Sequence, residues 1–269
     1  MMATHPFWTQ FAVPLSCDDC IKDISKVLHR VSGIQKVEGN LEEQLLAIEG
    51  TVPPSAIVKA IQETGRDAIL RGSGTSDNAA VSILETYYQS SNKKAAATEG
   101  SHQERYVRGL VRMVQVSSNV TVIDLTMLGV APGRYFASIR EFGDLKDGVC
   151  TVGPVWTNSS SGSSSGEVAD CKPSDRRGDL GTVEVGGDGR GSVFLDRPLQ
   201  VWEIIGRALV VAPRDDSLVG AEPLQNDENT VVGVIARSAG AWDNDKTVCS
   251  CSGKTLWQER EDEVKKGML

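Results

Sequence analysis

The sequence YFASIREFGD, residues 135–144, combines a short β-rich run with a glycine turn. Residues 134–139 have the composition of a strand, and Gly143 marks the turn that follows it. Similar short runs separated by glycines recur on both sides, at residues 79–84, 107–116, 120–125, 181–185, 191–195 and 208–212. Many short strands without a helical period predict an all-β sandwich or barrel.

The first 72 residues show a different pattern, in which strand and helix signals alternate. Apolar residues recur at helical spacing up to Gly33, among them Ile21, Ile24 and Leu28, and predict a first helix. A second helix begins at Pro53. The expected strands are residues 11–13, 33–41, 44–48 and 67–70, and the second helix ends at residue 65. The order βαββαβ predicts a ferredoxin-like layer of two helices on one sheet.

Length, charge and cysteine use limit the class of protein. The chain has 269 residues and a net charge of −8 with interspersed signs, so no concentrated basic patch favours nucleic acid. No apolar run approaches the roughly 18 residues of a membrane span, so no stable membrane insertion is expected. The N-terminus lacks a secretory signal pattern, which predicts a cytosolic protein, with the mitochondrial intermembrane space as a second compartment. Its six cysteines should then stay reduced, so close pairs indicate metal or redox chemistry.

Cys17 and Cys20 form the first close pair, in a loop that leads into a helix. The free N–H groups of a helix N-terminus lower the pKa of a thiol, and two thiolates can converge on one soft ion. Copper(I) prefers such donors and accepts two ligands, whereas structural zinc normally needs four. The alternatives are a thioredoxin-like redox pair, or two cysteines without a function.

Cys249 and Cys251 form the second pair, separated only by Ser250. In an extended segment, residues i and i+2 project to the same side, so both sulfurs can chelate copper(I). Oxidised, they would close a small ring, and such a disulfide is readily reduced, which suits thiol–disulfide exchange. The alternative is a tail without chemistry. Composition predicts a unit at residues 6–72, a linker at 73–78, a second domain at 79–241 and a tail at 242–269.

Several segments resemble known families. The Cys17–Cys20 loop resembles the Met-x-Cys-x-x-Cys loop of heavy-metal-associated domains, with Leu15 in place of the methionine. Residues 135–144, 178–181, 205–211 and 233–235 resemble copper,zinc superoxide dismutases. Residues 234–240 and 249–257 resemble the C-terminal tail of the copper chaperones for superoxide dismutase of the fungal type. The order of the three parts along the chain is also similar to that of this family. The resemblance implies a multidomain α+β and all-β protein. Its parts are a ferredoxin-like domain, a Greek-key β-barrel and a flexible C-terminal tail.

The metal ligands of the dismutases are almost entirely replaced. The resemblance places Ser138 and Arg140 where two copper histidines stand in that family, and Ala212 at a third. Val155 replaces the bridging histidine, a zinc histidine falls near Arg176, and only the aspartate remains, as Asp179. Cys150 matches a loop cysteine of that family, but Val232 stands where the family has the cysteine that forms a disulfide with it. Pairing of Cys150 with Cys171 instead is an open prediction. A lone carboxylate cannot hold zinc, so neither a zinc site nor dismutase activity is expected.

The dimer contacts of the dismutases are retained. The resemblance assigns them to Phe142, Gly143, Asp144, Ile205, Gly206, Arg207, Gly233, Val234 and Ile235. An isologous interface uses one patch on both subunits, so a homologue with this patch can replace one subunit. The implied partner is copper,zinc superoxide dismutase in a heterodimer, with a homodimer of this chain as an alternative.

The resemblance therefore implies a copper chaperone without enzymatic activity of its own on superoxide. Cys17 and Cys20 would take up Cu(I), and Cys249 and Cys251 would bind copper and exchange disulfides with the client. Two other functions stay open, namely a copper-storage or buffering protein and an atypical dismutase. The sequence does not say which cysteine pair delivers the copper.

Overall fold

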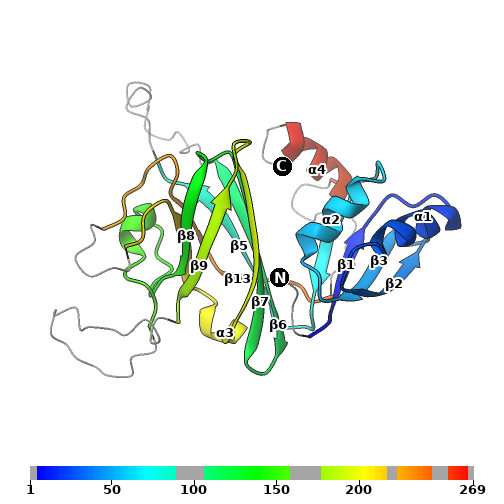
Figure 1. The fold of residues 1–269 in the computed structure, drawn as a ribbon, viewed down its shortest axis with the longest axis horizontal. Coiled ribbons are helices and arrows are strands. Elements are labelled where there is room, and N and C mark those ends of the chain that lie inside the picture. Colours follow the sequence, from blue (N-terminus) through cyan, green and yellow to red (C-terminus); the bar gives the residue numbers. More distant parts are fainter. Residues whose placement is uncertain (1–4, 89–105, 158–176, 217–222, 244–253, 266–269) are drawn as a thin grey trace. The chain divides into compact units, whose positions relative to one another are not determined.

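The N-terminal part of the chain forms an antiparallel four-stranded sheet with two helices, in the predicted order βαββαβ (Figure 1). In this computed structural model the described residues are 5–88, 106–157, 177–216, 223–243 and 254–265. The elements are β1 (Phe7–Ala12), α1 (Asp18–Leu28), β2 (Ile34–Asn40), β3 (Leu45–Gly50), α2 (Pro54–Gln62) and β4 (Ile69–Ser73). The strands lie in the order β2-β3-β1-β4.

The core of this unit follows the predicted helical spacing. Ile24 and Leu28, four residues apart on α1, are fully buried, as is Ile61 of α2. They pack with Phe11 and Ile48 of the sheet, and each such burial contributes about 1.5–3 kcal/mol relative to an exposed side chain. Pro54 at the first position of α2 loses no intrahelical bond there, because that amide has no partner in a helix.

Two strands of this sheet extend beyond their predicted limits. β1 begins at Phe7 rather than at residue 11, because residues 7–12 pair along their whole length with β3. β4 continues through Gly72 to Ser73, which composition alone assigns to the domain boundary. A Cβ atom on Gly72 would lie 1.9 Å from the carbonyl oxygen of Gly240. Gly72 is therefore required by a close backbone approach rather than by chain flexibility.

The middle of the chain is an antiparallel β-barrel, as predicted. Its strands are β5 (Ala79–Thr86), β6 (Val107–Ser117), β7 (Val120–Leu128), β8 (Gly133–Ile139), β9 (Asp179–Val185), β10 (Arg190–Arg197), β11 (Ala208–Ala212) and β12 (Val231–Val234). Within the described residues their order is β12-β11-β8-β9-β10-β7-β6-β5, and a further pairing of β12 with β5 closes the barrel. β13 (Ala236–Arg237) extends the edge of β5. The strands β7 and β8 follow each other in sequence but are separated by β9 and β10, which is a Greek-key connection.

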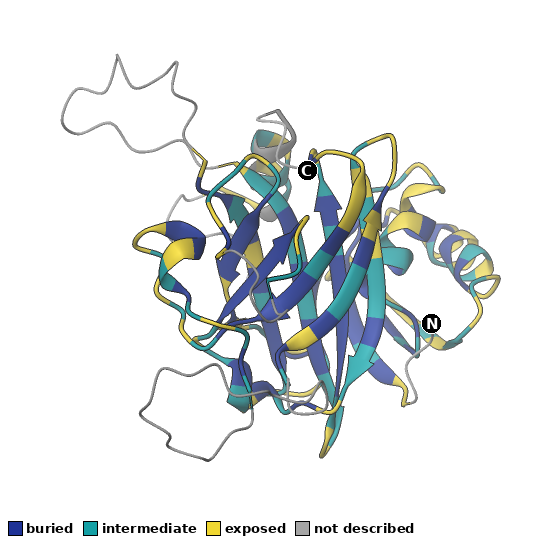
Figure 2. Cartoon of the chain, turned by 60° about the vertical axis from the view of Figure 1, so that its left-hand side comes forward, coloured by how far each residue is buried: buried dark blue, intermediate teal, exposed yellow. Residues whose placement is uncertain are grey.

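Buried and exposed positions alternate along many barrel strands (Figure 2). The fully buried Leu84, Met113, Ile123, Leu125 and Ile139 belong to one apolar core. Strand ends depend on pairing partners as much as on composition. β7 and β10 pair over eight positions, from Leu128 with Arg190 to Thr121 with Arg197, and both strands exceed their predicted lengths.

Three short elements lie outside the predicted strands. These are η2 (Gly148–Thr151), α3 (Val201–Ile204) and α4 (Leu256–Lys265). The chain divides into two compact units, one of residues 1–79, 114–117 and 238–269, the other of residues 80–113 and 118–237. Cys249, Cys251, Cys171 and Arg176 lie outside the described residues. In the part of the chain that is described, no helix has the length and apolar character needed to cross a bilayer.

Candidate functional site

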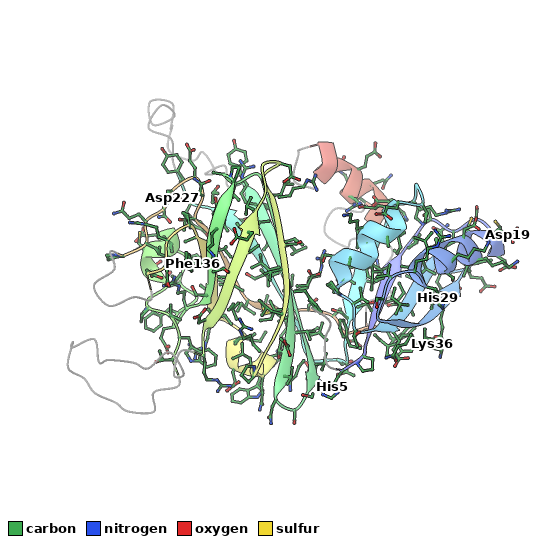
Figure 3. The ribbon with its side chains drawn as sticks, in the orientation of Figure 1. His5, Asp19, His29, Lys36, Phe136 and Asp227 are labelled. Atoms are coloured by element: carbon green, nitrogen blue, oxygen red, sulfur yellow. The ribbon has the colours of Figure 1, made fainter. Side chains whose placement is uncertain are left out.

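The first cysteine pair lies where the loop after β1 becomes helix α1. Cys17 is the N-cap of α1, and Cys20 lies in its first turn rather than in the predicted loop. The two Sγ atoms are 3.5 Å apart, with Cys17 exposed and Cys20 buried. Asp18 and Asp19 occupy the same turn, where the helix dipole favours negative charge (Asp19 is labelled in Figure 3). The two sulfurs are therefore close enough to act on one small ion.

The surroundings of Cys20 favour its thiolate. Hydrogen bonds from the Ser16 hydroxyl, 3.3 Å from the sulfur, and from the Ser16 backbone contribute most. Contacts with the Arg66 and Cys17 side chains act in the same direction, and burial opposes them. Together they lower the pKa of the Cys20 thiol to about 6. At neutral pH this position is a ready ligand for a soft metal ion.

The loop that carries the pair rests on apolar and polar supports. Leu15, at the methionine position of the resembling motif, is 4% exposed and packs in the same core as Cys20. The Gln44 side chain donates a hydrogen bond to the Leu15 carbonyl at 3.3 Å, and the Val13 amide donates to the Gln44 carbonyl at 2.9 Å. Leu15 therefore fills the space beneath the loop.

Four of the positions that the resemblance assigns to dismutase ligands line a cavity in the barrel. Its volume is about 150 Å³, and its walls include Phe136 (Figure 3), Ser138, Arg140, Val155 and Asp179. The Asp179 carboxylate accepts the Gly181 amide at 2.8 Å, which supports the turn into β9. Among the described residues, no three His, Cys, Asp or Glu side chains are grouped so that they could hold a metal ion.

An ion pair forms at Arg140, one of the positions that the resemblance assigns to a copper histidine. Arg140 is 3% exposed and donates two hydrogen bonds to the Asp216 carboxylate, at 2.6 and 2.8 Å. This paired geometry is the strongest form of an arginine–carboxylate contact. The backbone amide of Arg140 donates a hydrogen bond to the Ala208 carbonyl at 2.8 Å, and Arg140 also forms an isolated β-bridge with Val155. A guanidinium and a carboxylate thus join β8 to the chain after β11.

The three predicted dimer segments lie side by side in the barrel, joined by backbone hydrogen bonds. The Ala208 amide donates to the Phe142 carbonyl at 3.0 Å, and the Ile235 amide donates to the Arg207 carbonyl at 2.9 Å. The Gly206 amide in turn donates to the Ile235 carbonyl at 2.9 Å. We call residues 142–144, 205–207 and 233–235 the three-segment surface.

Exposure separates residues of this surface that can contact a partner from those that support them. Phe142 is 56% exposed and Val234 is 36% exposed, while Ile205 is half-buried. Ile235, by contrast, is fully buried in the barrel core, and Gly233 is packed against the Ile83 carbonyl. Gly233 and Ile235 therefore support Val234 from within the barrel, and their assignment to the partner contact stays a prediction.

Sequence patterns missed the most exposed aromatic of the barrel. Trp202, on α3 three residues before Ile205, is 66% exposed. A helix of four residues has no periodicity to detect, so only the unusual exposure in the folded chain reveals it. An exposed tryptophan beside other apolar side chains is typical of a protein contact.

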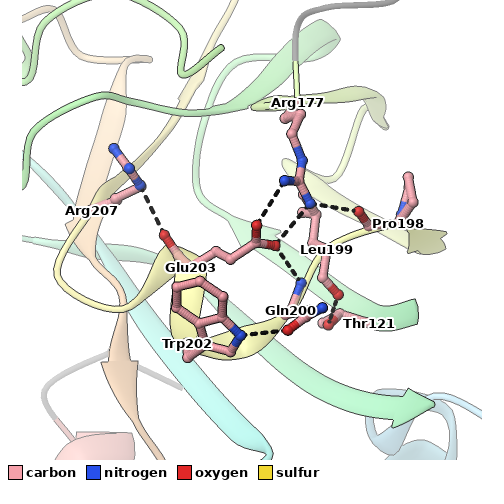
Figure 4. Close-up of polar contacts among 8 residues, drawn as sticks. All are labelled: Thr121, Arg177, Pro198, Leu199, Gln200, Trp202, Glu203 and Arg207. Atoms are coloured by element: carbon pink, nitrogen blue, oxygen red, sulfur yellow. Dashed lines mark hydrogen bonds and ion pairs between the residues drawn. The ribbon is translucent and has the colours of Figure 1, made fainter. Parts of the chain in front are cut away.

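A polar network fixes the helix that presents Trp202 (Figure 4). The Glu203 carboxylate accepts the Gln200 amide at 2.9 Å and completes a capping box at the start of α3. Arg177 donates to both oxygens of Glu203, at 2.7 and 2.8 Å, and to the Pro198 carbonyl at 3.0 Å. The Arg207 Nε atom donates to the Glu203 carbonyl at 3.0 Å. Short as it is, α3 is held from both ends.

Two families match separate parts of the chain. Residues 10–67 match the family described as heavy-metal-associated domain, and residues 107–235 match copper/zinc superoxide dismutase (SODC). These ranges include the Cys17–Cys20 loop and the three-segment surface, respectively.

Relatives match nearly the full length. The "Superoxide dismutase 1 copper chaperone" of Debaryomyces hansenii is 39% identical over 98% of this chain and 99% of its own length. The protein of that name from Saccharomyces cerevisiae is 38% identical, over 97% of both chains. The human "Copper chaperone for superoxide dismutase" is 35% identical over 93% of this chain and 88% of its own length.

Proposed function

The chain belongs to the copper chaperones for superoxide dismutase, and from that membership we propose how its parts divide the work. It binds copper through its heavy-metal-associated domain and serves superoxide dismutase as its client. Cys17 and Cys20 take up copper as Cu(I). The three-segment surface binds one immature dismutase subunit, and the tail cysteines act on that subunit.

The observation that carries the docking proposal is a set of exposed apolar side chains on the three-segment surface and on helix α3, which directly precedes residues 205–207. Phe142, Trp202 and Val234 are exposed, although each is attached to a rigid, hydrogen-bonded support. A folded chain gains nothing by exposing such side chains, whereas a partner of matching shape would bury them. Because dismutase dimers are isologous, the matching patch is that of a second dismutase-type barrel. The heterodimer with the client is proposed, and a homodimer through the same face competes with it.

The copper proposal rests on the chemistry of the cysteine pair. The two sulfurs are 3.5 Å apart and can converge on one ion, and the Cys20 thiol, with a pKa lowered to about 6, supplies a thiolate ligand at neutral pH. Such a donor set favours the low coordination number of Cu(I), and the barrel offers only Asp179 of the dismutase zinc ligands. We propose that the barrel binds no zinc and has no dismutase activity.

The tail proposal is a thiol–disulfide exchange between Cys249, Cys251 and the client. A client thiolate attacks one sulfur of the oxidised tail pair, and the other tail sulfur leaves as a thiolate. The second client thiolate then displaces the first tail sulfur from the mixed disulfide. The client gains its intrasubunit disulfide, and the tail gains two electrons and becomes the dithiol. The cytosol remains the proposed compartment.

Replacement of Trp202 by alanine tests the docking surface. The full chain is titrated with copper-free, disulfide-reduced dismutase, and the dissociation constant is measured by sedimentation velocity. Loss of a central aromatic should weaken the heterodimer at least about 30-fold, since such side chains contribute about 2 kcal/mol or more. Thermal unfolding should hardly change, because Trp202 is largely exposed.

Trp242→Ala is the matched control, since Trp242 is 58% exposed but belongs to the N-terminal unit. It should leave the dissociation constant of the heterodimer unchanged. Equal affinities of the wild-type chain and the Trp202→Ala variant would exclude Trp202 from the binding site and contradict docking through this part of the barrel.

A further inference from the structure

The loop of residues 145–153, which contains η2, is attached to the first segment of the three-segment surface. The Phe142 amide donates to the Val152 carbonyl at 3.0 Å. Gly153 lies against the Phe142 ring, since a Cβ atom on Gly153 would be 2.7 Å from a ring carbon. The position of this loop therefore influences the position of the exposed Phe142 side chain.

One side chain from outside the loop holds its centre. The Asn226 side-chain oxygen accepts the Val149 amide at 2.9 Å, and the Asn226 side-chain nitrogen donates to the Asp147 carbonyl at 2.9 Å. The approach is so close that a Cβ atom on Gly148 would lie 2.3 Å from the Asn226 oxygen. Asn226 thus bonds the loop backbone on both sides of Gly148, through its acceptor and one of its donors.

The backbone that carries Asn226 is itself fixed. The Asp227 carboxylate accepts the amides of Asn229 and Thr230 at 2.8 and 2.6 Å (Asp227 is labelled in Figure 3). Thr230 is buried and directly precedes β12. The Asn226 side chain therefore extends from a hydrogen-bonded turn at the edge of the barrel.

An apolar cluster supports the loop in the same position. Val149 and Val152 are buried, and they belong to a cluster with Val210 of β11 and Val232 of β12, separate from the main barrel core. Val232 stands where the resembling dismutases have a cysteine that forms a disulfide with this loop. Because valine has no sulfur, packing and the Asn226 hydrogen bonds hold the loop at this place without a covalent bond to β12.

We propose that Asn226 is a positioning residue of the partner site: it fixes the 145–153 loop, and through the loop it holds Phe142 in the orientation that a dismutase subunit binds. The inference rests on the proposed function, which assigns Phe142 to the contact with the client. Phe142 is 56% exposed, so burial within its own chain does little to fix its orientation. A side chain that is already held in its bound orientation loses less conformational entropy on binding.

Hydrogen exchange of the full, copper-free, reduced chain measures the loop directly. In Asn226→Ala the Val149 amide loses its acceptor, so exchange in residues 142–152 should rise roughly fivefold or more, while β11 stays protected. Asn229→Ala is the matched control, because the Asn229 side-chain oxygen accepts the Ala131 amide at 2.8 Å in a different turn. This control should leave exchange in the loop unchanged.

Binding to copper-free, disulfide-reduced dismutase, measured by sedimentation velocity, tests the effect on the partner site. Asn226→Ala should weaken the heterodimer roughly tenfold, and Asn229→Ala should leave its dissociation constant unchanged. Because Asn226 acts through Phe142, Asn226→Ala should lose little further affinity in a chain that already carries Phe142→Ala. In a chain that carries Trp202→Ala, by contrast, the free-energy losses of the two substitutions should add.

Three results would overturn the inference. These are unchanged loop exchange in Asn226→Ala, an affinity of Asn226→Ala equal to that of the wild-type chain, and a full tenfold loss in the Phe142→Ala background. Failure of the proposed function looks different, because the wild-type chain itself would then not bind dismutase. The partner role of Asn226 would fall with it, although the exchange result for the loop would be unaffected.

Discussion

The two cysteines of the copper loop are chemically unequal although they are only three residues apart. Cys17 is exposed at the helix N-cap, whereas Cys20 is buried and accepts hydrogen bonds that favour its thiolate. With a pKa of about 6, Cys20 is about nine-tenths ionised at pH 7. An exposed sulfur beside a preformed thiolate suits an exchange in which ligands are replaced one at a time.

Replacing Ser16 by alanine should therefore raise the pKa of Cys20. The Ser16 hydroxyl is the largest cause of the lowered value, and its loss removes a hydrogen bond that the thiolate accepts but the thiol does not need. The rate of Cys20 alkylation is measured by mass spectrometry over a range of pH, and its midpoint reports the pKa of the thiol. We expect this midpoint to rise from about pH 6 by roughly one unit in Ser16→Ala. The control Ser25→Ala, which lies on α1 like Cys20, should leave the midpoint unchanged. A pH profile of Ser16→Ala that coincides with that of the wild-type chain would contradict this explanation.

The buried ion pair between Arg140 and Asp216 gives a second prediction at the scale of residues. Asp216→Asn would leave the Arg140 guanidinium buried without its counter-charge, which typically costs about 3–5 kcal/mol of unfolding free energy. Urea denaturation of the full chain measures this loss.

Glu184→Gln is the control, because it breaks the ion pair with Arg134, which lies on β8, the strand that precedes Arg140, and is mostly exposed. That pair should contribute only about 0–1 kcal/mol. Equal losses in the two variants would mean that the Arg140–Asp216 pair does not stabilise the barrel.

Sequence alone showed what was missing from this site but not what replaced it. Ser138, Arg140 and Ala212 occupy ligand positions in a recognisable strand pattern, so the loss of the histidines is visible without coordinates. The Asp216 partner lies 76 residues from Arg140, in a segment without a motif, so only the closed barrel brings the two charges together.

At the scale of elements, the three-segment surface depends on backbone approach as much as on side chains. Gly143 faces the Gly206 carbonyl so closely that a Cβ atom would lie 1.9 Å from its oxygen. Gly143→Ala should push the 142–144 segment away from the 205–207 segment. We expect a loss of about 1–3 kcal/mol in unfolding free energy, together with weaker binding of dismutase.

Gly187→Ala provides the comparison, because a Cβ atom at Gly187 would meet no atom within 4 Å. It should change stability by no more than about 0.5 kcal/mol and leave dismutase binding intact. Normal stability and binding in Gly143→Ala would show that this close approach is not needed.

Elements with a clear period were predictable, and those without one were not. The spacing of Ile24 and Leu28 gave α1, and the short runs gave the barrel strands, although their ends shifted with pairing. The four residues of α3 form a helix because Gln200, Glu203 and Arg177 cap and brace them, and such long-range polar support leaves no periodic trace. Trp202 was missed for the same reason.

At the scale of the whole molecule, the proposed function assigns copper binding and client recognition to different folds in one chain. The ferredoxin-like domain supplies a pair of cysteine sulfurs, and the barrel contains a buried ion pair and exposed apolar side chains. The order of these parts was legible in sequence because each part carries a local motif. The contact of Arg260 in α4 with Asp67 was not, since it joins residues 193 positions apart through their charges.

Client activation tests the central claim most directly. Cu(I)-loaded protein is mixed with zinc-loaded, copper-free, disulfide-reduced dismutase in the presence of a Cu(I) chelator, oxygen is admitted, and dismutase activity and client thiols are followed. The proposed function predicts activity and loss of client thiols with the intact chain, but not with the Cys249→Ser/Cys251→Ser variant. An intact chain that keeps its copper while the dismutase stays inactive would contradict it and leave a copper-buffering protein.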